Sequence, residues 1–189
     1  SPWQRARAMV EPLRLLIDRL ATPIGELVLI ADAAGRLCAV EWSDHDDRIE
    51  RTLRLHFGKQ GFALQPLPNP GGLSAAMRTY FAGDLQVIDD LPVAMEGTDF
   101  QRTVWRALRQ IPCGTTISYA ELARRIGRPA AVRAVGLANG ANPVGVVVPC
   151  HRVIGADGSL TGYGGGIERK RWLLAHERAR ANLELPLSA

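Results

Sequence analysis

A cysteine stands beside a histidine and an arginine in the run Pro149-Cys150-His151-Arg152. The thiolate is the nucleophilic form of cysteine, and a free thiol with a pKa near ~8.5 is mostly protonated at neutral pH. A neighbouring imidazole and guanidinium both favour the thiolate, so this run suits nucleophilic chemistry. Adjacent strand residues point to opposite faces, so we expect His151 to reach Cys150 only at a bend or through a water. An inert, half-buried cysteine is the alternative.

The number and spacing of the cysteines exclude two kinds of site. Cys38, Cys113 and Cys150 are far apart and odd in number, which excludes a closed disulfide framework and offers no zinc-binding pair. We expect Cys38 and Cys113 to be structural. His45 and His56 have no ligand partners at a usable spacing, so we predict no metal site. Reduced thiols indicate an intracellular protein, and we expect a cytoplasmic location.

Charge is distributed unevenly along the 189 residues. The chain has 23 Lys and Arg against 19 Asp and Glu. Residues 1–100 contain 10 basic and 14 acidic side chains, whereas residues 101–152 contain eight arginines and Glu121 as their one acidic residue. Such a segment indicates a polyanion partner bound at one face, and a solvated helix surface is the alternative.

Composition excludes several classes of protein. Hydrophobic residues make up 47% and charged residues 22%, which is typical of a globular chain and not of a disordered or fibrous one. No run approaches the roughly 20 apolar residues that span a bilayer, so we expect no membrane association. Residues 1–11 lack the apolar run of a signal peptide.

The first half predicts a small α/β domain, residues 13–95, after a tail of residues 1–12. Two β-prone runs flank a short polar turn, which is typical of a hairpin, and apolar residues then recur at helical spacing. No residue of this half forms a chemical pattern. Its expected elements are two strands and two helices: residues 24–30, 37–42, 46–57 and 73–81.

The second half, residues 96–180, predicts a mainly α domain that precedes a tail of residues 181–189. Thr98 or Asp99 can cap its first helix, and Ser118 and Glu121 form a capping box for the next. Two short helices joined by a turn at Gly127 indicate a helix-turn-helix. The expected elements are four helices and a buried strand: residues 100–110, 119–126, 130–139, 167–178 and 144–148.

The helix expected near residues 130–139 has an unusual composition. Residues 130–141 contain five Ala and two Gly, with Arg133 as the one charged side chain. Glycine lowers helix propensity, so we expect the small side chains of this helix to serve a structural or functional role. Close packing against a neighbouring element is one explanation. The other is a backbone that lies deep in a nucleic-acid groove, with Arg133 projecting from it.

These segments together resemble the O6-alkylguanine-DNA alkyltransferases, in particular the bacterial members. The resemblance covers residues 98–177 through specific motifs, and the first half also resembles the bacterial members. It implies a ribonuclease-H-like, three-layer N-terminal domain with a supporting role and a mainly α C-terminal domain with a winged-helix-like helix-turn-helix. The motifs are Pro149-Cys150-His151-Arg152-Val153, Asn142-Pro143, Gly162-Tyr163, the run from Trp172 to Glu177, Thr22-Pro23-Ile24-Gly25, Ala39-Val40-Glu41-Trp42 and Asn69-Pro70-Gly71-Gly72.

The resemblance implies a role for each catalytic position. Cys150 matches the alkyl acceptor, and His151 matches the base that deprotonates it through a water. Glu177 matches the carboxylate that orients this histidine. Asn142 resembles the asparagine that braces the turn before the active-site loop. Tyr119 matches the tyrosine that donates to guanine N3 and crowds the target phosphate.

The resemblance also implies how DNA is bound. Arg133 matches the arginine that enters the duplex from the minor groove and replaces the flipped nucleotide. Where other members carry a serine after the loop tyrosine, this chain has Gly164, which removes a hydroxyl and, as a hypothesis, widens the pocket for larger alkyl groups. The other implied DNA contacts are Tyr119, Ala134, Gly136 and Arg152, and the implied pocket residues are Tyr163, Gly164 and Val153.

The implied activity is a single-turnover DNA repair reaction. The protein would flip O6-alkylguanine, and also O4-alkylthymine, out of double-stranded DNA and transfer the alkyl group to Cys150 as a stable thioether. No cofactor, structural zinc or obligate protein partner is implied, and we expect a monomer. Two alternatives are a non-catalytic regulator that binds damaged DNA, which the presence of Cys150 disfavours, and a Cys-His hydrolase, which would not explain Arg133.

Overall fold

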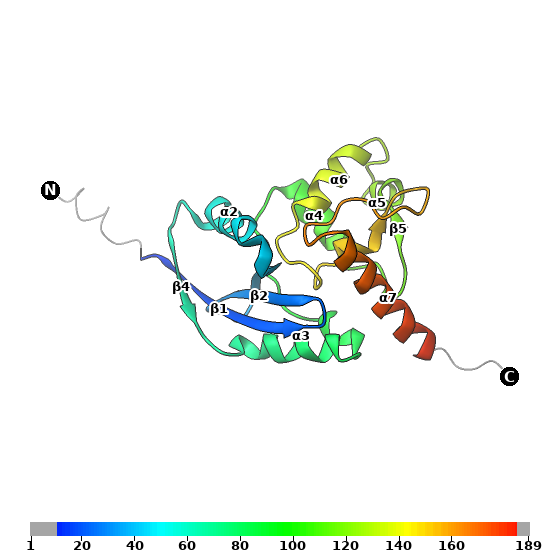
Figure 1. Ribbon diagram of the computed structural model, residues 1–189. Helices are drawn as coiled ribbons and strands as arrows, with labels where there is room; N and C mark the ends of the chain where they lie inside the picture. The colour runs from blue at the N-terminus through cyan, green and yellow to red at the C-terminus, as the bar shows by residue number, and fades with distance from the viewer. Residues whose placement is uncertain (1–10, 185–189) are drawn as a thin grey trace.

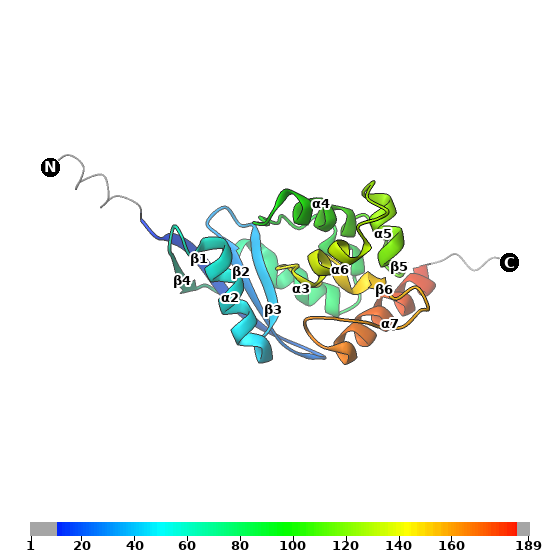
Figure 2. The ribbon, with the colours of Figure 1, turned by 90° about the horizontal axis from the view of Figure 1, so that it is seen from above.

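The computed structural model describes residues 11–184, so the predicted tails, residues 1–12 and 181–189, lie mostly outside the described residues. A mixed sheet with two helices forms the first half, and helices with a short two-stranded ladder form the second (Figure 1). Seen from above, the sheet half and the helical half lie side by side (Figure 2). The last helix continues to Glu184, beyond the predicted end at residue 178. None of the described helices is both long and apolar enough to cross a membrane.

The sheet has four strands in the order β3-β2-β1-β4. Strands β1, β2 and β3 are antiparallel neighbours, and β4 runs parallel to β1. The predicted hairpin is confirmed as β2 and β3, whereas β1 and β4 were not predicted. Residues Leu15 and Leu16 of β1 are both buried, so this strand lacks the alternation that identifies strands in a sequence. The bounds are β1 Leu13–Thr22, β2 Gly25–Asp32, β3 Leu37–Trp42 and β4 Phe62–Pro66.

A helix covers each face of this sheet. Helix α2 (Asp46–Phe57) buries Ile49, Leu53 and Phe57 against one face, as their spacing predicted. Helix α3 (Leu73–Phe81) lies on the opposite face and buries Met77 and Tyr80 there (Figure 1). The first half is therefore a three-layer α/β/α arrangement.

Two helices of the second half begin at a capping side chain. A capping box of Thr98 and Gln101 starts α4 (Asp99–Leu108). Ser118 caps α5 (Tyr119–Arg125), but Glu121 does not return the bond as predicted, because its carboxylate binds Arg124 and Arg125. The remaining helices are α6 (Val132–Gly140) and α7 (Ile167–Glu184), and the two-stranded ladder is β5 (Ile117–Ser118) with β6 (Val153–Ile154).

Residues 144–148 do not form the predicted strand. Only Val144 forms a bridge, to Val40 of β3, and Val146 takes a positive φ of 69°. The Asn142 side chain supplies what a neighbouring strand would: its Nδ2 donates to Val148 O at 2.7 Å, and its Oδ1 accepts from Val144 N at 3.0 Å. A continuous apolar run predicted burial correctly but not its backbone form.

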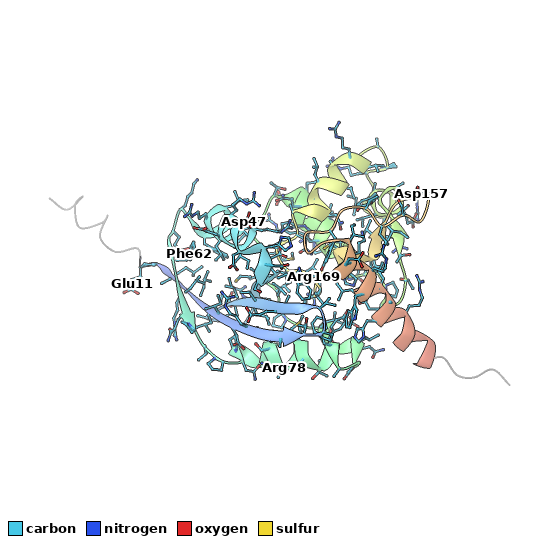
Figure 3. All side chains as sticks on the ribbon, in the orientation of Figure 1. Glu11, Asp47, Phe62, Arg78, Asp157 and Arg169 are labelled. Carbon is cyan, nitrogen blue, oxygen red and sulfur yellow. The ribbon has the colours of Figure 1, made fainter. Side chains whose placement is uncertain are left out.

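The two halves share one hydrophobic core, which runs from β2 and β3 through α3 to α4, α5 and α6. Within the second half, Trp105 Nε1 donates to Ala138 O at 2.8 Å and so ties α4 to α6. Between the halves, Arg169 of α7 reaches back to the sheet side (Figure 3), where it donates to Ile24 O and pairs with Asp44 at 2.8 Å. The second half is thus held in a fixed position against the sheet.

Candidate active site

Cys150 lies at the wall of a cavity of about 300 Å³. It begins a 3₁₀ turn, Cys150–Arg152, directly after Pro149, and it is 8% exposed. The second half supplies most of the cavity lining, and α2 contributes one residue. Its other lining residues are Arg48, Tyr119, Gly136, Asn139, Gly140, Gly162, Tyr163 and Gly164.

The 3₁₀ turn separates the side chains of three consecutive residues. Cys150 lines the cavity, while His151 and Arg152 both reach the buried carboxylate of Glu177 on α7. His151 Nε2 lies 2.9 Å from Glu177 Oε1. Arg152 donates from Nε to Oε1 at 2.9 Å and from Nη2 to Oε2 at 2.8 Å. The sequence expected His151 and Glu177 to meet, and the structure brings them together.

Arg152 does not have the position that the sequence predicted. It is 2% exposed, and its Nη1 donates to Ile111 O at 2.8 Å. A guanidinium paired with a buried carboxylate cannot reach a DNA backbone or stabilise a thiolate in the cavity, so both predictions for Arg152 were wrong. Its charge neutralises Glu177 instead.

Glu177 is held ionised in the protein interior. Burial by itself would raise its pKa, but the charges and hydrogen bonds of His151 and Arg152 outweigh burial and hold the pKa far below its ordinary value. The fourth contact comes from Tyr80 of α3, whose hydroxyl donates to Oε2 at 3.0 Å. Sequence reasoning missed Tyr80, because nothing in the pattern of α3 distinguishes it from a core aromatic residue.

The second ring nitrogen of His151 is uncommitted. His151 is 0% exposed, and among the described residues its Nδ1 has no hydrogen-bond partner. In the tautomer whose Nε2–H donates to Glu177, Nδ1 is the acceptor of the ring. The histidine therefore presents an acceptor within the interior, next to Cys150 in the chain.

Burial raises the pKa of the Cys150 thiol, and this is opposed by a hydrogen bond from Asn142 and by the charges of Lys170 and Arg48. The cations near the thiol are thus not the ones adjacent in sequence. Cys38 and Cys113, expected to be structural, have pKa values raised to about 12, mainly by burial.

Lys170 is a second residue that the sequence did not identify. Its side chain is fully buried, and Nζ donates to Val153 O at 2.7 Å and to Thr161 O at 2.9 Å. These carbonyls lie at the two ends of residues 153–161, so Lys170 ties the ends of this loop together. Val153 itself, predicted as a pocket residue, is buried in β6 and does not line the cavity.

Helices α5 and α6 form the outer wall of the cavity. Tyr119, the first residue of α5, lines it, and the backbone of Gly136 faces the tyrosine ring: a Cβ there would lie 3.8 Å from it. The Tyr119 hydroxyl donates to Thr161 O at 3.3 Å. On α6, Arg133 and Ala134 are exposed, and the helix is covered on its other side by α4 and α5. The packing explanation of the thin helix is therefore confirmed, and binding in a nucleic-acid groove stays a prediction for its open face.

Comparison with known proteins identifies the family of this chain. The family model described as "6-O-methylguanine DNA methyltransferase, DNA binding domain" matches residues 99–179. The methylated-DNA–protein-cysteine methyltransferase of Shigella flexneri is 54% identical over 165 residues, which is 87% of this chain and 96% of that protein. The chain belongs to the methylated-DNA–protein-cysteine methyltransferase family.

Other members of this family are similar along most of the chain. The methylated-DNA–protein-cysteine methyltransferase of Salmonella typhimurium is 55% identical over 87% of this chain and 96% of its own length. The crystal structure of Mycobacterium tuberculosis OGT in complex with DNA superimposes with a TM-score of 0.72 at 44% identity, covering 89% of this chain and 94% of that one. The similarity includes the sheet half, which the family model leaves out.

In this methyltransferase the sheet half contributes directly to the site, contrary to our expectation that residues 13–95 carry no chemistry. Tyr80 binds Glu177, and Arg48 lines the cavity. Arg48 lies beside Gly164: a Cβ on Gly164 would lie 2.7 Å from the Arg48 guanidinium carbon. That Gly164 widens the pocket for larger alkyl groups stays a hypothesis.

Proposed function

We propose that this chain repairs alkylated DNA by transferring the alkyl group from O6 of guanine, and also from O4 of thymine, to Cys150. The relatives named above are methylated-DNA–protein-cysteine methyltransferases, and one related structure is a complex with DNA. The observation that carries the assignment of residues is the position of Cys150 on a cavity wall, with the His151–Glu177 pair behind it.

DNA binds to the open face of α6 in this proposal, with the minor groove toward Arg133 and Ala134. A base inside a duplex does not expose its O6 substituent, so the nucleotide must leave the stack, which costs a few kcal/mol. Arg133 enters the space that the base leaves and recovers part of that cost. The exposed position of Arg133 and the thinness of α6 beside it support this role.

The transfer step is an in-line displacement. A water carries the Cys150 proton to His151 Nδ1, the ring nitrogen that Glu177 does not bind. The sulfur electron pair forms a bond to the alkyl carbon while the carbon–O6 bond breaks and leaves its electron pair on the purine. Tyr119 gives its hydroxyl proton to the departing base at N3, which restores guanine in the DNA. The Tyr119 oxygen then takes a proton from water and His151 returns to water the proton it received from Cys150, so no net proton is gained or lost.

The stability of the thioether product limits each protein molecule to one reaction. A thioether at Cys150 is not hydrolysed by any group in the cavity, so each protein molecule reacts once. Asn142 fixes the segment before Cys150 through its two backbone bonds, and Tyr163 borders the base in the cavity. The thiol, the ring and the hydroxyl complete the reaction without a cofactor in this proposal.

The finer architecture fits the same proposal. Three antiparallel strands with a fourth parallel to the first support a ribonuclease-H-like description of the sheet half. The pair α5 and α6 beside the β5–β6 ladder supports a winged-helix-like helix-turn-helix. We further propose a cytoplasmic monomer that needs no protein partner.

Labelling tests the function directly. A duplex with one radiolabelled O6-methylguanine is incubated with the protein, and label is counted in the protein fraction. One label per protein molecule that is lost in Cys150→Ala supports the proposal. Binding without transfer would indicate a damage-binding regulator, and release of labelled methanol with turnover would indicate a hydrolase.

A further inference from the structure

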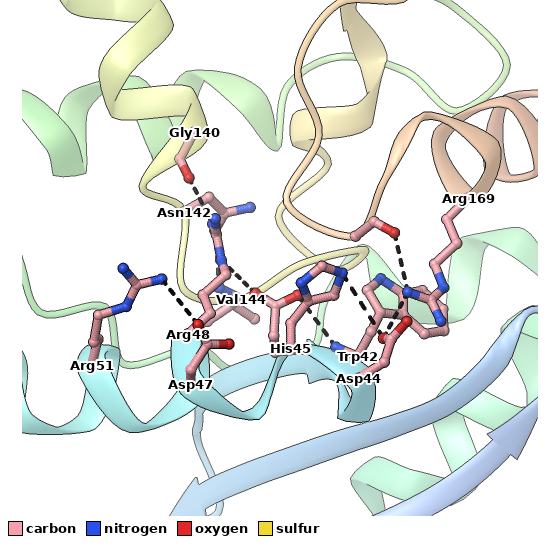
Figure 4. Close-up of polar contacts among 12 residues, drawn as sticks. Trp42, Asp44, His45, Asp47, Arg48, Arg51, Gly140, Asn142, Val144 and Arg169 are labelled. Atoms are coloured by element: carbon pink, nitrogen blue, oxygen red, sulfur yellow. Dashed lines mark hydrogen bonds and ion pairs between the residues drawn. The ribbon is translucent and has the colours of Figure 1, made fainter.

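Arg48 reaches the cavity from the opposite half of the molecule. It lies on α2, and its Nη2 donates to Gly140 O at the end of α6 at 2.6 Å, a contact drawn in Figure 4. Its Nε pairs with Glu41 of β3 at 2.7 Å. These two contacts fix the guanidinium through Nε and Nη2 and leave the two N–H donors of Nη1 free of both.

The free donors lie beside the backbone of Gly164. A Cβ on Gly164 would be 2.9 Å from Nη1 and 2.7 Å from the guanidinium carbon, and both residues line the cavity with Cys150. Gly164 does not have a positive φ, so its backbone does not require glycine. A side chain at position 164 would instead meet the Arg48 guanidinium.

Arg48 is the only cationic side chain among the residues that line the cavity. Arg152 is paired with Glu177, and Lys170 donates to two loop carbonyls. The Arg48 side chain is 29% exposed, as expected for a group that borders an open cavity and not one enclosed in the core. A charged donor in such a site has its greatest effect on an atom that gains negative charge during a reaction.

We propose that Arg48 is a catalytic residue of the sheet half, which donates from Nη1 to O6 of the flipped base. This inference rests on the proposed function. As the sulfur–carbon bond forms and the carbon–O6 bond breaks, the bonding pair moves onto the purine, and the Arg48 donor stabilises the negative charge on O6. The proton that completes guanine still comes through the Tyr119 side of the base. Arg48 also limits the space beside the alkyl group.

The test is a cycle of variants at positions 48 and 164, with single-turnover transfer from an O6-methylguanine duplex as the readout. Arg48→Ala should slow transfer by about 100- to 1,000-fold, in line with the loss of one transition-state donor, while duplex affinity changes little. Gly164→Ser alone should also slow it, because its side chain meets the guanidinium. In the double variant, the serine hydroxyl takes the vacated place and should restore part of the rate. Arg51→Ala, an exposed arginine on the same helix, is the matched control.

The variant Arg48→Lys controls for loss of folding, because it keeps a positive charge beside Glu41. A lysine cannot make three directed contacts, so this variant should fold and still transfer the alkyl group slowly. Normal transfer by Arg48→Ala, a loss confined to duplex affinity, or a double variant slower than both single variants would overturn the inference. If the wild-type protein takes up no label at Cys150, the proposed function fails instead.

Discussion

The Glu177 carboxylate on α7 receives a hydrogen bond from the Tyr80 hydroxyl of α3 at 3.0 Å, across the boundary between the two halves. The same carboxylate binds His151 and Arg152. A residue of the sheet half thus contacts the group that orients the proposed base, and the site depends on the packing of both halves.

Removing this hydroxyl should destabilise the protein without disturbing its packing. In Tyr80→Phe the ring keeps its contacts with Phe81 and His176. A hydrogen bond to a charged group is worth about 1.5–3 kcal/mol, and the free energy of unfolding should fall by that amount. Urea unfolding measures it, and the Glu177→Gln background supplies the control: a loss of the same size there would show that the two residues are not coupled.

Glu177 should make stability depend on pH in acid. Its folded-state pKa is depressed, so its contribution is fully present above the ordinary value of 4.5 and is lost as the pH falls through the folded-state value. Glu177→Gln should cost roughly 3–5 kcal/mol at neutral pH, because it leaves Arg152 buried and unpaired. Urea unfolding of both proteins between about pH 6 and about pH 3 should show the difference shrinking toward low pH. A constant difference across this range would contradict the assigned ion pair.

Lys170 should control the reactivity of Cys150. Lys170→Met removes a cation that opposes the effect of burial on the thiol, so the pKa of Cys150 should rise further. A higher pKa lowers the thiolate fraction at neutral pH, so alkylation of Cys150 by iodoacetamide should slow in Lys170→Met. The exposed neighbour Arg171→Met is the control. Equal rates in wild type and Lys170→Met would mean that the lysine serves the loop alone.

Arg133 should matter for duplex DNA and not for chemistry. Arg133→Ala should slow repair of an O6-methylguanine duplex by at least about tenfold, since base extrusion costs a few kcal/mol and 1.4 kcal/mol is a factor of ten. Reaction with free O6-benzylguanine, if the wild type accepts it, should be unaffected. Losses of equal size on both substrates would contradict a role in extrusion.

The sequence predicted the site better than the elements that position it. Cys150, Tyr119 and Tyr163 line one cavity, and His151 meets Glu177, although the strand expected before Cys150 is a turn held by Asn142. Local patterns signal burial and helices well, but they do not signal which backbone form a short apolar run adopts.

The residues that sequence reasoning missed act over long separations. Arg48, Tyr80 and Lys170 look like ordinary surface or core residues in their own helices, and only the packing of α2, α3 and α7 brings them to Cys150 and Glu177. The prediction for Arg152 was wrong for the opposite reason. This residue is close to the thiol in the sequence, but the 3₁₀ turn directs its side chain to Glu177. Arg152 follows Cys150 closely in the chain, but its charge lies beside Glu177 and not beside the thiol.

Intact-mass measurement after reaction with an excess of O6-methylguanine duplex tests the central claim most directly. The account predicts that every protein molecule gains one methyl group in place of a proton, that peptide mapping places it on Cys150, and that the reacted protein repairs no second duplex. Repeated turnover, or a methyl group on Cys38, Cys113 or any residue other than Cys150, would contradict it.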